Sequence, residues 1–145
     1  MFKRILVPTD GSDISKRVMQ DCMKFAKEIG AEVVGLAVAP PFSAYVYQAQ
    51  VLVDAESRFN DECAEYANRC LADLNAAAKE FGVKCESFYM VGDFPYESII
   101  QTAKDKHCDL IAMASHGRKG IKGLLLGSET HKVLTHSQIP VLVFR

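Results

Sequence analysis

The fold is decided by residues 109–145, which read DLIAMASHGRKGIKGLLLGSETHKVLTHSQIPVLVFR. An apolar run (110–114) enters a loop of Ser, Gly and basic residues (115–120), and a helix capped by Ser128 and a second apolar run (141–144) follow. A strand, a glycine-containing loop and a helix N-terminus commonly form a phosphate site, because exposed N–H groups and the helix dipole attract an anion. Glycine lets the backbone approach the phosphate closely or adopt a positive φ. The stretch therefore predicts a strand–loop–helix–strand unit with an anion site.

The same alternation of strand and helix extends over the rest of the chain. Apolar residues recur every three or four positions from Ile14 to Ile29, which predicts an amphipathic helix with these residues on its buried face and Gly30 as its stop. Residues 83–91 alternate between apolar and polar, as an edge strand does. By these rules we expect strands at 5–8, 31–38, 83–91, 110–114 and 141–144, and helices at 14–29, 54–81, from Pro95 onward, and 128–136.

Strands that alternate with helices fold into a parallel sheet with right-handed crossovers and helices on both faces. The composition agrees, because 145 residues with 49% hydrophobic and 24% charged side chains are typical of a globular domain. We therefore expect residues 1–145 to form a single α/β domain with three layers, α/β/α. In such sheets ligands bind beyond the carboxyl ends of the strands, where the strand order reverses.

Charge, hydropathy and cysteine content exclude several classes of protein. The formal net charge of −1 gives no basis for attraction to nucleic acid or to an anionic membrane. Neither a bilayer-spanning apolar run nor a signal peptide is visible, so we expect a cytoplasmic protein. The five cysteines are scattered and form no Cys-x-x-Cys pair, which favours buried thiols in a reducing compartment over metal ligands.

The glycine spacing resembles the nucleotide-binding pattern of the universal stress protein family, Gly-x2-Gly-x9-Gly-Ser/Thr. Gly117 is followed after nine residues by Gly127-Ser128, and Ala114 stands where the pattern has its first glycine. The segments ILVPTDGS (5–12) and IPVLV (139–143) resemble the family's first strand with its turn and its last strand. The resemblance thus covers the whole chain.

This resemblance implies a Rossmann-like fold of the adenine nucleotide alpha hydrolase-like type, with five parallel strands in the order 3-2-1-4-5. The order would then reverse between the first and fourth strands. Residues 10–12 and 115–117 follow these two strands, so the resemblance implies that both loops converge on one crevice.

The resemblance also implies a ligand, an adenine nucleotide (ATP or AMP, with Mg²⁺ as a candidate companion). Pro8, Thr9 and Asp10 would line the adenosine pocket. Gly117, Gly127 and Ser128 would contact phosphate, and Glu129 would offer only its backbone N–H. The complete set of predicted nucleotide-binding residues is Pro8, Thr9, Asp10, Val38, Gly92, Met113, Ala114, Ser115, His116, Gly117, Arg118, Gly120, Gly127, Ser128, Glu129 and Thr130.

Several of these residues have an equally simple structural interpretation. Asp10 before a glycine is a common turn former, and Ser128 is a common helix cap worth about 1 kcal/mol. Val38 is apolar and suits the core as well as an adenine edge. Basic residues on a loop, such as Arg118, are usually solvated, although here they adjoin the anion site. Residues 41–53 have no period and suit either a flap over the nucleotide or a partner surface.

The motifs of several nucleotide-using enzymes are absent from the sequence. It contains neither Gly-x4-Gly-Lys-Ser/Thr nor Gly-x-Gly-x-x-Gly, and no nucleophile, base or metal constellation is recognisable. The resemblance implies a regulatory ATP- or AMP-binding protein of the stress response that hydrolyses ATP slowly at most. Two alternatives remain open: a nucleotide-free interaction module, suggested by Ala114, and a slow ATP hydrolase in which Asp10 holds Mg²⁺.

The last strand is the expected contact of a homodimer, the assembly that the resemblance implies. Its residues are apolar, and they would form an exposed sheet edge in a monomer. Pairing this edge with that of a second copy removes the exposure. The predicted interface residues are Val141, Leu142, Val143 and Phe144.

Overall fold

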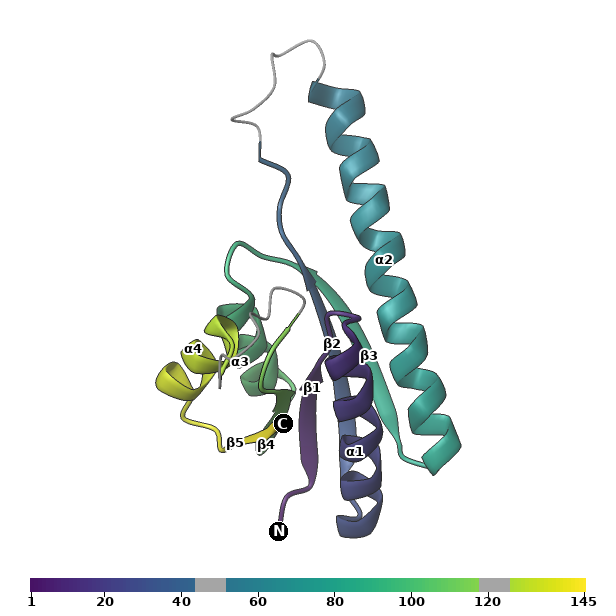
Figure 1. Ribbon diagram of the computed structural model, residues 1–145, viewed down its shortest axis with the longest axis vertical. Coiled ribbons are helices and arrows are strands. Elements are labelled where there is room, and N and C mark those ends of the chain that lie inside the picture. The colour runs from purple at the N-terminus through teal and green to yellow at the C-terminus, as the bar shows by residue number, and fades with distance from the viewer. Residues whose placement is uncertain (44–51, 118–125) are drawn as a thin grey trace.

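Strands and helices alternate along the residues that the computed structural model describes, which are 1–43, 52–117 and 126–145 (Figure 1). The strands are β1 (Arg4–Pro8), β2 (Glu32–Ala39), β3 (Cys85–Val91), β4 (Leu110–Ala114) and β5 (Val141–Phe144). The helices are α1 (Asp13–Ile29), α2 (Leu52–Phe81), α3 (Pro95–Asp105) and α4 (Ser128–His136). The α/β alternation expected from the sequence is confirmed, with shifts of one or two residues at some element ends.

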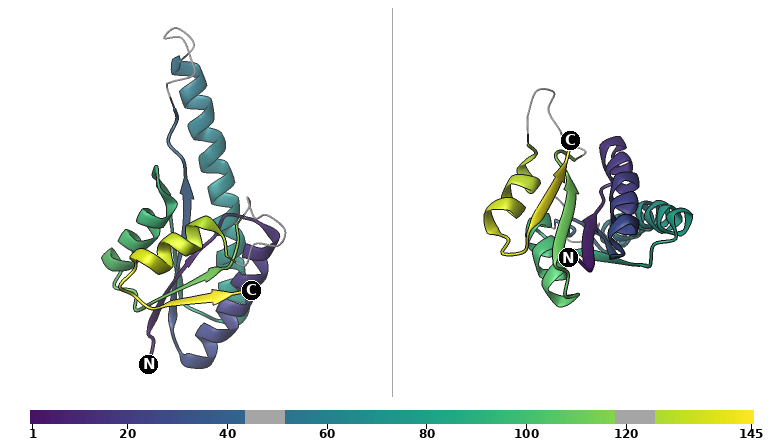
Figure 2. Two further views of the ribbon diagram at one scale, coloured as in Figure 1. Left: turned by 60° about the vertical axis from the view of Figure 1, so that its left-hand side comes forward. Right: turned by 90° about the horizontal axis from the view of Figure 1, so that it is seen from below.

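The five strands form one parallel sheet in the order β3-β2-β1-β4-β5, which confirms the predicted order. Figure 2 shows the sheet between two layers of helices. Helices α1 and α2 contribute to the core on one face, and α3 and α4 to the core on the other. β3 and β5 lie at the two edges, as expected for both. The strand order reverses between β1 and β4, so these neighbours define the place where a ligand is expected.

The central strand β1 shows why its sequence lacks polar alternation. Ile5 and Val7 belong to the core under α1 and α2, whereas Leu6 belongs to the core under α3 and α4. Successive side chains of a strand point to opposite faces, and here each face is covered by helices. All three side chains are buried.

Helix α1 has clear signals at both ends. The Ser12 hydroxyl accepts the backbone N–H of Ser15 at 3.2 Å, which satisfies one of the helix's first donors. Gly30 has φ 69° and ends the helix in the left-handed conformation, as predicted. The expected buried face was partly wrong: Ile29 is 36% exposed, while Met19 and Met23 are buried. The buried stripe is therefore rotated away from the terminal Ile29.

Helix α2 is long, and its N-terminal half extends past the sheet (Figure 1). In the C-terminal half both Cys70 and Leu74 are buried, Leu74 against Gly35 of β2 and Cys70 beside Gly11. In the N-terminal half, Phe59 is only partly buried and packs against Phe42, with ring centroids 5.5 Å apart. Only the second half of α2 therefore reaches the main core.

The five cysteines are free thiols, three of them buried. Burial raises the pKa of Cys22 to about 12 and that of Cys108 to about 11, so both behave as small apolar side chains. Among the described helices, none combines the length and apolar character needed to cross a membrane.

Candidate functional site

Two loops meet at the carboxyl ends of β1 and β4, where the strand order reverses. Asp10 follows β1, and Gly117 lies in the loop after β4. A Cβ atom added to Gly117 would lie 2.5 Å from Oδ2 of Asp10. The carboxylate therefore fits against this loop only because residue 117 is glycine. The predicted convergence of the two motifs is present in the structure.

The β1 loop is held in place by several hydrogen bonds. Oδ1 of Asp10 accepts the N–H of Ser12 at 3.0 Å, and the Asp10 carbonyl accepts the Tyr66 hydroxyl at 2.5 Å. The buried Thr9 donates its N–H to the Leu36 carbonyl at 2.8 Å. Asp10 is thus a turn former at the start of α1 and also faces the β4 loop. The two interpretations of Asp10 are compatible.

Ser115 joins three elements at the end of β4. Its N–H donates to the carbonyl of Phe144 in β5 at 2.8 Å, and its carbonyl accepts the N–H of Gly127 at 2.6 Å. Its hydroxyl lies 2.7 Å from Nδ1 of His116. The residue is 1% exposed. Ser115 therefore fixes the start of α4 beside the β4 loop.

Gly127, rather than Ser128, is the N-cap of α4, which corrects the sequence prediction. Gly127 is extended, with φ −69° and ψ 156°, and its carbonyl accepts the N–H of His131 at 2.9 Å. Its bond to Ser115 sets this conformation, so Ser128 becomes the first helical residue. A Cβ atom on Gly127 would lie 3.1 Å from the Ser115 carbonyl oxygen and 3.3 Å from Cα of His116. The glycine thus allows the helix start to approach the loop backbone closely.

The position of Ala114, where the family pattern has a glycine, carries no backbone strain. Ala114 ends β4 and pairs with Phe144, and its φ is not positive. Its carbonyl accepts the hydroxyl of Thr130 at 2.9 Å, and Thr130 is buried. The preceding Met113 is buried in the core. The methyl group of Ala114 is therefore compatible with the strand and leaves the backbone groups in place.

Val38 and Gly92 lie side by side near the carboxyl ends of β2 and β3. A Cβ atom on Gly92 would be 2.5 Å from the Ser98 Oγ atom and 4.0 Å from Cγ1 of Val38. The N–H of Gly92 donates to the Ala39 carbonyl at 3.0 Å. Val38 is partly buried and packs against the core below α3. Gly92 thus lies against the Ser98 side chain of α3 whether or not a ligand is bound.

The Glu129 side chain points toward α3, which the sequence did not predict. Its Oε2 accepts the backbone N–H of Tyr96 at 3.0 Å, and its Oε1 lies 3.2 Å from Nζ of Lys132. Tyr96 in turn donates its hydroxyl to Glu97 at 2.9 Å, and this hydrogen bond raises the pKa of Tyr96. The carboxylate of Glu129 therefore has partners of its own.

Two predicted site residues, Arg118 and Gly120, lie outside the described residues. The same holds for Lys119 and Lys122 and for residues 44–51 of the segment predicted as a flap or partner surface. Within the described residues, no three His, Cys, Asp or Glu side chains gather closely enough to hold a metal ion.

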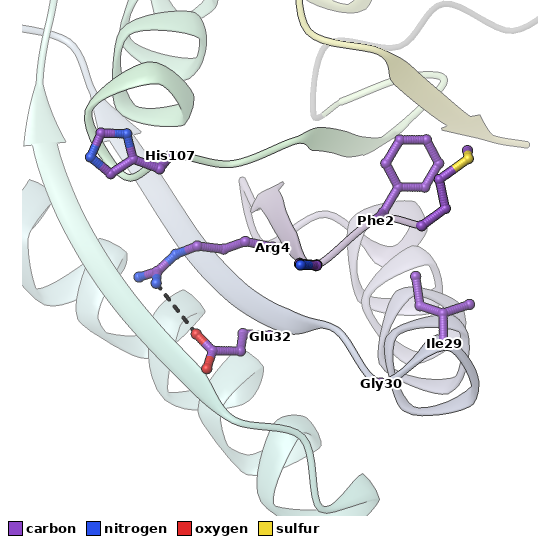
Figure 3. Close-up of a pocket in the computed structure, with 8 residues that line it drawn as sticks. Phe2, Arg4, Ile29, Gly30, Glu32 and His107 are labelled. Carbon is purple, nitrogen blue, oxygen red and sulfur yellow. Dashed lines mark hydrogen bonds and ion pairs between the residues drawn. The ribbon is translucent and has the colours of Figure 1, made fainter.

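A pocket of about 600 Å³ lies at the opposite, amino end of the sheet (Figure 3). Figure 3 shows Arg4 directed toward Glu32, with Phe2 and Ile29 on the other side. The guanidinium lies 3.3 Å from Glu32 and 3.0 Å from Glu86. Because these carboxylates already pair with the cation, the pocket offers no comparable anion site.

A parallel α/β sheet with glycine-lined loops at its reversal point defines a class of ligand-binding fold. The model of the universal stress protein family matches residues 1–145, and the chain belongs to this family. It is 33% identical to universal stress protein YxiE of Bacillus subtilis, covering 100% of both chains. It is 32% identical to universal stress protein MJ0531 of Methanocaldococcus jannaschii, covering 100% of this chain and 83% of that protein.

The fold also matches solved structures. The hypothetical protein MJ0577 superposes with a TM-score of 0.83 at 30% identity, covering 99% of this chain and 95% of that one. More distant structures include a universal stress protein in complex with cAMP (TM-score 0.70, 23% identity). Another is a universal stress protein from Archaeoglobus fulgidus in complex with dAMP (TM-score 0.71, 18% identity). Some structural neighbours of this chain therefore bind adenine nucleotides.

Proposed function

We propose that this protein binds an adenine nucleotide, ATP or AMP, and acts as a regulatory protein of the stress response. The observation that carries the proposal is the contact between Asp10 and Gly117 at the reversal point, with Gly127 against the same loop. Both glycines leave space that any other residue would fill. The complexes of structural neighbours with cAMP and dAMP support the same ligand class.

In this proposal the adenosine and the phosphates occupy different parts of the crevice. Adenosine lies against the β1 side, with Asp10 as the polar contact and Val38 and Gly92 beside it. The phosphates lie at the start of α4, because its first N–H groups have no partner within the helix and its dipole is positive there. Ser128 adds its hydroxyl. The proposed phosphate contacts are backbone and side-chain groups of His116, Gly117, Arg118, Gly120, Gly127, Ser128 and Thr130, with Ser115 holding the loop behind them through its own backbone bonds.

The proposal includes binding rather than chemistry. A hydroxyl next to an imidazole, as in Ser115 and His116, is the arrangement of an activated nucleophile. Ser115 is buried, however, and its backbone is bound on both sides, so a substrate has no access to its Oγ atom. In the alternative of a slow ATP hydrolase, Asp10 would instead hold the Mg²⁺ that accompanies ATP.

Homodimerisation through β5 is the second part of the proposal. β5 is an edge strand, and its four residues are only partly buried in the single chain. Antiparallel pairing with a second β5 supplies partners for its outer backbone groups. Leu142→Lys is expected to give a monomer by size-exclusion chromatography with light scattering, because a charge then lies at the interface. Leu134→Lys, on an exposed site of α4, is the control, and a persisting Leu142→Lys dimer would rule out this interface.

The nucleotide is tested on freshly purified protein. The protein is denatured, and the supernatant is separated by anion-exchange chromatography. We expect ATP or AMP from the wild type and none from Gly127→Val, whose side chain would push against Ser115 and His116. Equal folding of the two proteins by circular dichroism is required for this comparison. A wild-type protein that carries no nucleotide and fails to bind added ATP or AMP would contradict the proposal.

A further inference from the structure

Helix α3 begins without a capping side chain of its own. Its N-cap is Phe94, which offers no acceptor, and Pro95 follows as the first helical residue. The next residue, Tyr96, has a backbone N–H that the helix itself does not satisfy. Its acceptor is Oε2 of Glu129 at 3.0 Å, from a residue 33 positions later in the chain. A different helix thus supplies the cap of α3.

Glu129 connects the N-termini of two helices. It lies in the first turn of α4, directly after Ser128, and its carboxylate reaches the first turn of α3. The positive ends of both helix dipoles therefore act on one carboxylate, and Lys132 adds a cation at 3.2 Å. The Glu129 side chain is 36% exposed. Solvent therefore weakens its ion pair with Lys132 more than its hydrogen bond to the Tyr96 N–H.

The first turn of α3, which Glu129 reaches, directly follows the β3–α3 turn that contains Gly92. Gly92 lies between the end of β3 and the start of α3, beside Val38 on the proposed adenosine side of the crevice. Val91 and Phe94, on either side of the turn, are each 53% exposed. The α4 start, in contrast, is the proposed phosphate side. Glu129 is therefore a side-chain link between the two sides of the crevice.

We infer that Glu129 is a positioning residue that transmits phosphate binding at α4 to the β3–α3 turn. The inference rests on the proposed function. A phosphate at the α4 N-terminus repels the carboxylate and competes with it for the positive end of the α4 dipole, so the carboxylate shifts toward its existing partner, the Tyr96 N–H. The bond between Glu129 and Tyr96 then strengthens, and the exposed surface of Val91 and Phe94 becomes more ordered when nucleotide is bound.

The cap itself is tested without nucleotide, by amide hydrogen exchange of Tyr96 measured with NMR. In Glu129→Ala the Tyr96 amide is expected to exchange about tenfold faster than in the wild type, a factor that corresponds to about 1.4 kcal/mol. Glu129→Gln retains an acceptor oxygen and is expected to restore most of the protection. Lys132→Ala is the matched control, because it removes the other partner of the carboxylate and leaves the cap. Equal exchange rates of the Tyr96 amide in the wild type and in Glu129→Ala would show that Glu129 does not cap α3.

The transmission is tested by adding saturating ATP to the same proteins. In the wild type ATP is expected to slow exchange of the Tyr96 amide by about threefold or more. In Glu129→Ala, which keeps the backbone N–H predicted to contact the nucleotide, ATP is expected to have no effect on this amide, and calorimetry measures how much ATP the variant binds. The same slowing in both proteins, or none in a wild type that binds ATP by calorimetry, would overturn the transmission. If the wild type binds no ATP, the proposed function fails and the transmission fails with it, whereas the cap is still decided by the nucleotide-free experiment.

Discussion

The two ends of the parallel sheet differ in how their polar groups find partners. At the amino end the Asp109 carboxylate accepts the N–H of Lys3 at 2.9 Å and that of Arg4 at 3.0 Å. The Arg4 guanidinium then bridges Glu32 and Glu86. These charged groups bind one another, so they have partners within the chain. This arrangement serves the fold.

At the carboxyl end, glycines take the place of ion pairs. Gly117 leaves room for the Asp10 carboxylate, and Gly127 leaves room for the loop backbone. The N-cap of α4 is a glycine that offers no side-chain bond to the first helical N–H groups. The ion pairs at the amino end therefore stabilise the fold. Among the described residues the carboxyl end has fewer salt bridges, and it has the helix N-terminus on which the proposed nucleotide site depends.

The largest expected effect comes from adding one methyl group at the carboxyl end. In Gly117→Ala the new Cβ atom displaces the Asp10 carboxylate, since it would lie 2.5 Å from Oδ2. We expect the Kd for ATP, measured by isothermal titration calorimetry, to rise by about 100-fold, or about 2.7 kcal/mol. Gly82→Ala is the control. It strains a positive φ in open space and is expected to lower stability by about 1 kcal/mol without changing the Kd. Unchanged ATP affinity in Gly117→Ala would remove Asp10 from the site.

The matching change at the amino end should lower stability and leave the affinity for ATP nearly unchanged. Asp109→Ala removes the acceptor of two backbone N–H groups, those of Lys3 and Arg4. We expect the free energy of unfolding in urea to fall by about 1–2 kcal/mol. ATP affinity, measured on the folded protein, should stay within about twofold of the wild type. A loss of affinity as large as that of Gly117→Ala would show that the two ends are not separate in function.

Ser128→Ala separates capping from ligand binding. Because Gly127 is the cap, removal of the Ser128 hydroxyl should change the free energy of unfolding by less than about 0.5 kcal/mol. The affinity for ATP should fall about fivefold, as one lost hydrogen bond to a phosphate predicts. Thr135→Ala, on the same helix, loses a hydroxyl that bonds the His131 carbonyl and should leave the affinity unchanged. A stability loss of about 1 kcal/mol in Ser128→Ala, with normal ATP affinity, would restore Ser128 to a capping role.

The smallest expected effect is on the pH dependence of stability, through Glu32 at the amino end of the sheet. The hydrogen bond from Lys84 lowers the pKa of Glu32, with further help from the charges of Lys84 and Arg4. A lowered folded-state pKa means that this stabilisation is complete above the unfolded pKa of about 4.3 and is lost as the pH falls through the folded value. We expect the urea midpoint of the wild type to decline below about pH 4.3 more steeply than that of Glu32→Gln. Parallel pH profiles would mean that the ion pairs of Glu32 contribute nothing to stability.

Much of the fold was predictable because local signals agreed with the global arrangement. Buried strands such as β1 are apolar on both faces, and Gly30 marks the end of α1 with a positive φ. The strand order came from the family resemblance, since hydrophobic periodicity does not determine which strands are neighbours. The buried face of α1 was misplaced at Ile29, because helical spacing does not show where the sheet below the helix ends.

For the candidate site, only the course of the backbone could be predicted from the sequence. The spacing of Gly117 and Gly127 indicated the loop, but the cap at Gly127 depends on a bond to Ser115 that spacing cannot show. The link from Glu129 to Tyr96 joins residues 33 positions apart, and no local pattern contains it. The role of a side chain that bonds a different helix or strand can therefore be assigned only from the three-dimensional structure.

The central claim is that the two loops at the carboxyl end form one nucleotide site and that the amino end does not take part. ATP titrated into uniformly 15N-labelled protein tests it directly, with amide shifts followed by NMR. We predict that the amides of Gly11, Ser12, Gly117 and Gly127 shift together with one common Kd, while those of Arg4 and His107 stay in place. Shifts confined to one loop, or centred on Arg4 and His107, would contradict the claim.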